Sequence, residues 1–263
     1  MKEPCHPPHQ AGNLRLVVID VDGCLTPGEG QPWDFEALKY IGGLNRQARV
    51  EASLNDAPTV PAVTLCTGRQ EPYVEVLMQA IDAHMPAIYE NGGGLYLPHT
   101  YRFVENPCIT TEVKKALAQV KEALRREVVE QGLGYFQPGK EVSLTLYPTD
   151  GVSVSQLYRA VSEVLAAQEA LYAAEEAATC VNVIPVGVDK GTGVRWLSEE
   201  TGISLEDMGG IGDSVSDLKF LRMVGLSAAP ANASSAVKAE VDYVSPYQDG
   251  AGVVDILRRW VGH

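Results

Sequence analysis

LRLVVIDVDGCLT, residues 14–26, is the stretch that decides the fold of this chain. Residues 14–20 form a short run rich in β-branched side chains, which is typical of a strand buried on both faces of a parallel sheet. The run ends in Asp20, and Asp22 follows it just before Gly23. The stretch therefore predicts a buried parallel strand with two carboxylates at its end.

Helix and strand patterns alternate after this stretch and again near the end of the chain. The predicted helices cover residues 34–52, 72–83, 191–201, 217–224 and 253–260. The predicted strands cover residues 60–66, 87–89, 208–211, 226–229 and 243–244. This order predicts an α/β fold whose core is a doubly wound, Rossmann-like parallel sheet.

The middle of the chain has a different pattern. It contains an amphipathic helix over residues 110–131, a strand at 142–147, a helix at 154–167 and a strand at 180–184, while the limits within 166–178 stay open. Strands interleaved with two helices predict an α+β module with an open antiparallel sheet. We therefore expect a core domain of residues 1–97 and 185–263, with 1–12 as a frayed tail, and an inserted domain of residues 98–184.

The chain carries a net charge of −13, from 34 acidic and 21 basic residues. An acidic surface repels nucleic acid backbones and anionic membranes, so neither is an expected partner. Solubility alone accounts for a charge of this size. A small anionic substrate is still compatible with it, because local cations or a bound metal reverse the field at one site.

The five cysteines are widely separated and form no Cys-x-x-Cys pair. This pattern favours a reducing compartment over a disulfide framework, and it gives no sign of a zinc site. No apolar segment resembles a signal peptide or reaches membrane-spanning length, so we expect a cytoplasmic protein. Cys5, His6 and His9 lie close together but belong to the proline-flanked tail, where we expect no metal site.

Asp20 and Asp22 form the first candidate for catalysis. A carboxylate at this place can ligate a metal and attack an electrophile, and its neighbour can carry a proton to the leaving oxygen. Two close carboxylates repel each other, and a divalent cation relieves that repulsion. For an isolated pair of this kind, a loop with two solvated aspartates is the simpler alternative.

Three other predicted strands also end in polar or flexible residues. Thr67 and Gly68 stand at a strand-to-helix turn, where a hydroxyl and backbone N–H groups can hold phosphate oxygens. Lys190 can neutralise a phosphate oxygen, and Asp213 with Asp217 can ligate a hard cation. Taken singly, these are an ordinary helix cap, a surface lysine and a capping aspartate. Because the carboxyl ends of the strands in an open α/β sheet form one crevice, their joint occurrence predicts a single site.

These four segments resemble the four motifs of the haloacid dehalogenase (HAD) superfamily. The layout is similar to its type IIB (Cof-like) members, in which an α+β cap of the C2B type is inserted between the second and third motifs. Further resemblance lies in residues 89–93 (YENGG), 230–233 (PANA) and 242–244 (DYV). The match covers the chain from residue 14 onward. It is most similar to archaeal-type phosphoglycolate phosphatases, and next to sucrose-phosphate and related sugar phosphatases.

The resemblance implies a magnesium-dependent phosphatase that acts through an aspartyl-phosphate intermediate. Asp20 would be the nucleophile, and Asp22 would protonate the leaving alkoxide and then activate water. The Mg2+ ligands would be Asp20, Asp22 through its backbone carbonyl, and Asp213, with Asp217 close behind. The substrate would be a small phosphorylated metabolite, and the protein would be a monomer or a homodimer.

The same resemblance implies that Thr67, Gly68 and Lys190 hold the phosphoryl oxygens as charge develops. The supporting residues would be Asn91, Ser214 and Asn232. One departure from the family pattern is Ser216, where many relatives carry asparagine. Serine keeps a hydroxyl but lacks the amide, which leaves a direct role of position 216 in metal binding open.

Two alternatives share this scaffold: a hexose phosphomutase with the same kind of cap, and a catalytically silent phosphate-binding protein. The second is disfavoured because all the core acids are retained. Within the phosphatase interpretation, cap side chains are expected to select the substrate. An anionic substrate such as phosphoglycolate predicts a cationic cap residue facing the crevice, and a neutral sugar phosphate predicts hydroxyl and amide groups. The cationic candidates are Arg102, Lys140 and Arg159.

Overall fold

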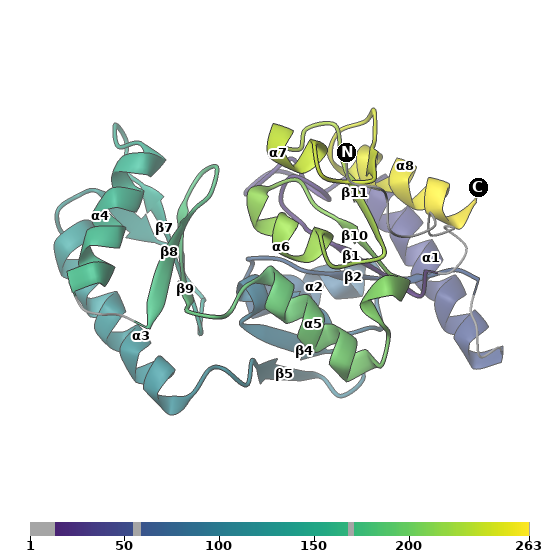
Figure 1. The fold of residues 1–263 in the computed structure, drawn as a ribbon, viewed down its shortest axis with the longest axis horizontal. Coiled ribbons are helices and arrows are strands. Elements are labelled where there is room, and N and C mark those ends of the chain that lie inside the picture. Colours follow the sequence, from purple (N-terminus) through teal and green to yellow (C-terminus); the bar gives the residue numbers. More distant parts are fainter. Residues whose placement is uncertain (1–13, 55–58, 168–170, 263) are drawn as a thin grey trace, which may run out of the picture.

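The computed structural model describes residues 14–54, 59–167 and 171–262, so the predicted tail with Cys5, His6 and His9 lies outside the described residues. The chain forms two bodies that lie side by side (Figure 1). The larger body is built on a five-stranded parallel sheet in the order β12–β11–β10–β1–β2. Its strands are β1 (Leu16–Ile19), β2 (Ala62–Leu65), β10 (Met208–Ile211), β11 (Leu226–Ala229) and β12 (Tyr243–Val244).

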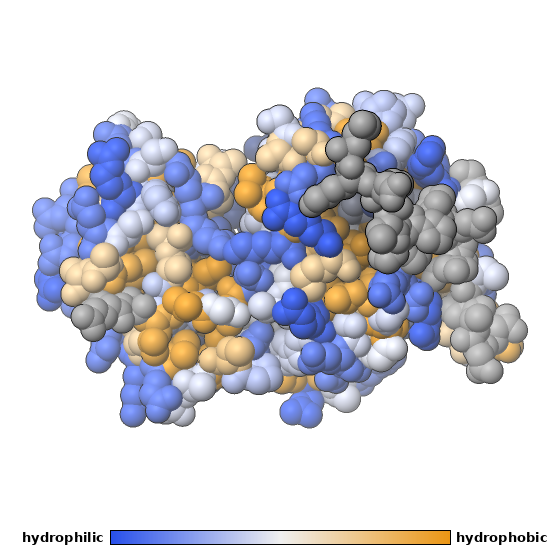
Figure 2. Space-filling model, viewed as in Figure 1, coloured by the Kyte–Doolittle hydropathy of each residue, from blue (hydrophilic) through white to orange (hydrophobic). Residues whose placement is uncertain are grey.

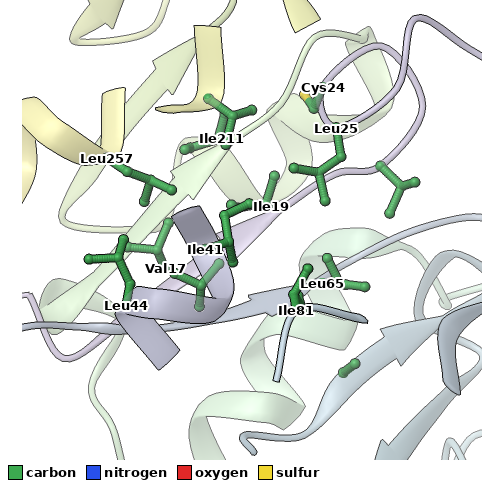
Figure 3. Packing of buried hydrophobic residues seen from close by; sticks show 14 of the residues in the cluster. Val17, Ile19, Cys24, Leu25, Ile41, Leu44, Leu65, Ile81, Ile211 and Leu257 are labelled. Carbon is green, nitrogen blue, oxygen red and sulfur yellow. The ribbon is translucent and has the colours of Figure 1, made fainter. Parts of the chain in front are cut away.

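The interior strand β1, which pairs with β10 and β2, explains why both faces of this sheet are covered by helices. Its four residues are fully buried, and they alternate between two hydrophobic clusters. Val17 and Ile19 belong to one cluster, which Figure 3 shows from close by, and Leu16 and Val18 belong to the other. The first cluster includes side chains of α1 (Phe35–Leu54), α2 (Glu71–Ala80) and α8 (Asp249–Val261), and the second includes side chains of α5 (Lys190–Thr201), α6 (Leu218–Leu221) and α7 (Ser235–Lys238). The predicted doubly wound α/β core is confirmed.

A three-stranded antiparallel sheet continues from the β2 edge of the parallel sheet. It consists of β3 (Ala87–Tyr89), β4 (Gly94–Leu97) and β5 (Arg102–Glu105). The backbone N–H of Thr67 donates to the carbonyl of Ile88 at 3.1 Å and joins the two sheets. The sequence did not predict β4 and β5, because glycines precede β4 and few β-branched residues follow. Since β5 pairs with β4, we propose a domain boundary after residue 105; the boundaries at 97 and 184 stay predictions.

The smaller body is the inserted α+β cap, with a four-stranded antiparallel sheet in the order β6–β7–β9–β8. The strands are β6 (Gly134–Phe136), β7 (Leu144–Pro148), β8 (Tyr172–Glu176) and β9 (Val181–Pro185), and the helices are α3 (Thr111–Leu124) and α4 (Val154–Ala167). The predicted helix at 110–131 ends earlier, in a wider helical turn over Arg125–Val129. The alanine- and glutamate-rich segment left open in the sequence contains β8, whose residues all pair with β9. Tertiary pairing outweighs the helical propensity of this segment.

The surface of both bodies is mainly polar on the face shown in Figure 2, with smaller hydrophobic areas between the polar side chains. Across the described residues, none of the helices has the length and hydrophobicity that crossing a membrane requires.

Candidate active site

The acidic loop after β1 is a tight turn. The backbone N–H groups of Cys24, Leu25 and Thr26 all point to the carbonyl of Val21, at 3.2, 2.8 and 3.1 Å. Gly23 has a φ of +87°, and a Cβ at this position would lie 2.4 Å from Oδ2 of Asp213. Glycine therefore meets two requirements at once, a left-handed backbone and the close approach of a second acidic loop.

A buried ion triad lies beneath this loop. Nζ of Lys190 is 2.8 Å from Oδ1 of Asp20 and 2.6 Å from Oδ1 of Asp217. Burial raises the pKa of Asp20 well above its usual value, and repulsion from Asp217 adds to the effect, while Lys190 opposes it. Burial acts to lower the pKa of Lys190, but the attraction of Asp20 and Asp217 outweighs it and raises that pKa. The lysine is therefore held as a cation against Asp20.

Asp213 completes an acidic cluster at the ends of β1 and β10. One carboxylate oxygen from each of Asp20, Asp213 and Asp217 lies within 4.8 Å of the others. Burial raises the pKa of Asp213 to about 7, and repulsion from Asp217 contributes. An all-oxygen donor set in which the carboxylates repel one another fits a hard divalent cation.

Asp217 is engaged differently from the other two acids. Its Oδ1 accepts the Lys190 hydrogen bond, and its Oδ2 accepts from Asp213 N at 3.1 Å, Ser214 N at 2.9 Å and Ser214 Oγ at 2.9 Å. Both oxygens are thus occupied by protein donors. This arrangement favours Asp20 and Asp213 as the carboxylates that would hold a metal, with Asp217 holding Lys190 and the 213–214 loop in place.

Thr67 and Gly68 lie at the end of β2, facing the acidic loop across one cavity of about 230 Å³. Arg69 N donates to Oγ1 of Thr67 at 3.1 Å, and Asn91 N donates to the Thr67 carbonyl at 3.0 Å. Asn91 itself has a φ of 57°, and its side-chain oxygen would be 3.0 Å from a Cβ at position 68. Thr67, Gly68 and Asn91 therefore form one wall of the cavity that contains Asp20.

Arg69 is a site residue whose role the sequence alone did not reveal. Its guanidinium donates Nε and Nη2 to the two oxygens of Asp22, each at 2.7 Å, and lies 4.7 Å above the ring of Tyr73. Glu29 is 3.9 Å from Nε and also accepts the hydroxyl of Tyr147 in the cap. The sequence shows that Arg69 belongs to the second motif, directly after Gly68. No pattern of neighbouring residues indicates that its side chain binds Asp22.

The cap contributes the opposite wall of the cavity through Lys140, Thr145, Asn182 and residues 177–180. Of the three cationic candidates, Lys140 lines the cavity, whereas Arg102 on β5 and Arg159 on α4 do not. A larger cavity of about 830 Å³ between α1 and α8 contains none of the predicted site residues. The sequence alone did not reveal Thr145 and Asn182, because their meeting depends on the register of β7 against β9.

Comparison with known proteins shows which family the chain resembles. Residues 140–257 match the model of the haloacid dehalogenase-like hydrolase family. The chain is 24% identical over 249 residues to a phosphoglycolate phosphatase of Methanothermobacter thermautotrophicus, covering 95% of this chain and 100% of the relative. It is 29% identical over 254 residues to the 5-amino-6-(5-phospho-D-ribitylamino)uracil phosphatase of Bacillus subtilis, covering 95% of this chain and 96% of the relative.

Two solved structures show the same fold over almost the whole chain. A HAD subclass IIB sugar phosphatase has a TM-score of 0.66 at 18% identity, with 94% of this chain and 98% of the other covered. The sucrose-phosphatase of Synechocystis sp. PCC6803 has a TM-score of 0.66 at 12% identity, with 94% and 97% covered. The resemblance of the chain to haloacid dehalogenase-like hydrolases is confirmed, and its fold is that of a HAD subclass IIB structure.

Two of the predicted supporting residues, Ser214 and Asn232, form hydrogen bonds within the loops of the site. Nδ2 of Asn232 donates to the carbonyl of Gly23 at 2.7 Å, and its Oδ1 accepts from Asp249 N at 2.9 Å. The hydroxyl of Ser214 lies 2.8 Å from that of Ser216, which lines the cavity. Asn232 thus holds the turn that carries Asp20 and Asp22, and Ser216 is hydrogen-bonded to Ser214 beside the cavity.

Proposed function

We propose that this hydrolase is a magnesium-dependent phosphatase of a small phosphate monoester, in which Asp20 attacks phosphorus. The observation that carries the proposal is the position of the Asp20 carboxylate. It is buried, paired with Lys190 at 2.8 Å, and faces the same cavity as Thr67 and Gly68. A carboxylate held beside a cation, opposite a hydroxyl and a turn of backbone N–H groups, suits attack on a phosphoryl group.

The residues divide the chemistry between them. Asp20 attacks phosphorus and becomes the aspartyl phosphate, while Thr67, Gly68 N–H and Lys190 bind the phosphoryl oxygens. Asp22 gives its proton to the leaving oxygen and then takes one from the water that cleaves the intermediate. In the pairing with Arg69 both Asp22 oxygens are occupied, so proton transfer requires that this contact loosens when substrate binds.

Mg2+ is the cation we propose for the acidic cluster. Asp20, Asp213 and the backbone carbonyl of Asp22 would hold it, and its charge would offset the repulsion between these carboxylates and the phosphate. Support comes from the oxygen-only donors within 4.8 Å of one another and from the repulsion of Asp217, which adds to the effect of burial in raising the pKa of Asp213.

The partner in this proposal is a small phosphorylated metabolite. Two of the relatives are named for phosphoglycolate and for a ribitylamino-uracil phosphate, so a phosphate ester that carries a carboxylate and a sugar-alcohol phosphate are both candidate substrates. We also propose a cytoplasmic location, supported by the free thiols of Cys24, Cys66, Cys108 and Cys180.

The test is the release of phosphate by the Asp20→Asn variant. With p-nitrophenyl phosphate and Mg2+, the wild type should release phosphate and the variant should be inactive, while EDTA should inactivate the wild type. Asp150→Asn, at an exposed cap position, is the matched control for loss of one carboxylate. Full activity of Asp20→Asn would overturn the mechanism. Isomerised hexose phosphate without free phosphate would instead identify a phosphomutase.

A further inference from the structure

The cap places one buried cation in the cavity without an acidic partner of its own. We propose that Lys140 is the specificity-determining residue of this enzyme and that it receives a carboxylate on the leaving group of the phosphate ester. This inference rests on the proposed phosphatase activity and names the class of its substrate.

The position of Lys140 is the first argument. It lies just before β7, is only 9% exposed, and lines the same cavity as Asp20, Thr67 and Lys190. The phosphoryl group is expected against Asp20 and Lys190 in the core. Lys140 therefore stands on the cap wall, where the rest of the substrate would lie.

The charge of Lys140 is the second argument. Its one hydrogen bond within the described residues goes to the neutral hydroxyl of Thr145, and it forms no ion pair there. Glu90 is the acid that acts on it most strongly, but that carboxylate already accepts the N–H groups of residues 141–143. Burial lowers the pKa of Lys140. An anion bound beside Lys140 would offset the cost of burying its positive charge, because an opposite charge favours the cationic form.

The direction of the hydrogen bonds is the third argument. An ammonium only donates, so Thr145 accepts from Lys140 and must give its own proton to Oδ1 of Asn182, at 2.7 Å. The Asn182 amide nitrogen is then turned away from Thr145 and has no hydrogen bond within the described part of the chain. Two side chains on the cap wall are left with unused donors: the ammonium of Lys140 and the amide of Asn182. Two donors match the two oxygens of a carboxylate.

The cavity favours a carboxylate over a larger or more highly charged group. Its volume is about 230 Å³, shared between the phosphoryl group and the leaving group, which leaves room for only a few heavy atoms. Asp22 and Glu29 also line it, so a second phosphate with its higher charge would be repelled more strongly than a carboxylate. A neutral hydroxyl would leave the buried ammonium uncompensated.

Glu90, in the core, binds the residues that follow Lys140 in the chain. Its carboxylate accepts Glu141 N at 2.9 Å, Val142 N at 3.2 Å, and both N and Oγ of Ser143, at 2.8 and 2.6 Å. These residues follow Lys140 directly in the chain. The cap segment that carries Lys140 is therefore held by the core turn that also carries Asn91.

The test compares two substrates that differ only in the proposed group. Phosphoglycolate carries the carboxylate, and 2-hydroxyethyl phosphate carries a neutral alcohol of similar size. The wild type should prefer phosphoglycolate in kcat/KM, and Lys140→Met should reduce this preference about 30-fold or more, the loss expected when one partner of a buried charge pair is removed. Lys140→Arg should restore part of the preference. Lys121→Met, at an exposed lysine of α3, should leave the preference unchanged.

A second measurement needs no variant and covers the case in which Lys140→Met does not fold. Glycolate should inhibit the wild type competitively at concentrations at least tenfold lower than ethylene glycol does. Equal inhibition by the two, a wild-type preference for the neutral substrate, or an equal loss on both substrates in Lys140→Met would overturn the inference. In each case phosphate release from p-nitrophenyl phosphate would still uphold the phosphatase. A wild type that hydrolyses none of these esters would overturn both proposals.

Discussion

Nε and Nη2 of Arg69 each lie 2.7 Å from a different oxygen of the Asp22 carboxylate. The two residues come from neighbouring strand ends of the sheet, after β2 and β1. The guanidinium is in turn held by the ring of Tyr73 at 4.7 Å. The orientation of the proposed acid/base residue is therefore set by a planar fork that a lysine cannot reproduce.

Arg69→Lys should lower kcat by about 10- to 100-fold, because a misplaced proton donor costs rate although the charge is retained. KM should change less than kcat, since the side chain of Arg69 contacts Asp22 rather than the phosphoryl-binding residues, and its backbone contact with Thr67 is kept. Arg49→Lys is the matched control, because Arg49 pairs with Asp82 at an exposed position far from the cavity. Steady-state kinetics of both variants measure the effect, and an unchanged kcat in Arg69→Lys would show that the fork has no positioning role.

Asp22→Ala should separate the two halves of the proposed reaction. With p-nitrophenyl phosphate the leaving group needs no proton donor, so the first half can proceed while the intermediate waits for water activation. Stopped-flow absorbance should show a burst of about one nitrophenolate per active site, followed by a steady state reduced about 100- to 10,000-fold, the usual contribution of general acid–base catalysis. Asp20→Asn should show no burst. A steady state close to that of the wild type would contradict the role of Asp22.

Mg2+ should stabilise the protein more at pH 8 than at pH 5. Burial and repulsion from Asp217 raise the pKa of Asp213 to about 7, against about 4 for an unfolded aspartate. Between about pH 4 and about pH 7 the folded metal-free protein therefore binds one proton on Asp213 that the unfolded chain does not bind. This proton binding stabilises the folded state, and the stabilisation is lost as the pH rises toward 7. At pH 8 the ionised cluster has most to gain from a cation.

The measurement is Tm with Mg2+ minus Tm with EDTA at each pH. Asp213→Asn should remove most of the pH dependence of this difference, because the titrating carboxyl is gone. A gain that is equal at pH 5 and pH 8 in the wild type would argue against the acidic cluster as the metal site.

Glu90→Gln should destabilise the protein by about 2–4 kcal/mol, because hydrogen bonds to a buried charged acceptor are lost and an amide N–H is turned toward backbone donors. Ser143→Ala removes only the hydroxyl contact at 2.6 Å and should cost about 1 kcal/mol. Denaturant unfolding measures both. A loss in Glu90→Gln no larger than that in Ser143→Ala would mean that Glu90 does not hold the cap segment.

The core half of the site could be predicted from single stretches of sequence. Asp20, Thr67 and Asp213 each follow an apolar run that is buried on both faces, and the carboxyl ends of parallel strands meet at one edge. Lys190 stands at the start of a helix whose Gly193 packs closely against Ile88 of β3. These residues come together because of sheet topology, which the alternation of strands and helices already implies. Their catalytic roles remain predictions.

The cap half could not be predicted in the same way. Thr145 and Asn182 are ordinary strand residues until antiparallel pairing sets them opposite each other. Tyr147 and Glu29 are 118 positions apart and meet only where the cap rests on the core. Side chains of an antiparallel sheet change face with a shift of one residue, so no local pattern assigns them to the cavity.

The sequence by itself determined the α/β class, the family resemblance and the four strand ends that carry the acids, the threonine and the lysine. This follows because buried parallel strands and their terminal loops are recorded in contiguous residues. Only the tertiary structure decided that Arg69 grips Asp22, that Asp217 gives both oxygens to protein donors, and that Lys140 rather than Arg102 or Arg159 faces the cavity. Those relationships depend on strand register and on how the cap packs against the core. Both are set by segments that lie far apart in the sequence.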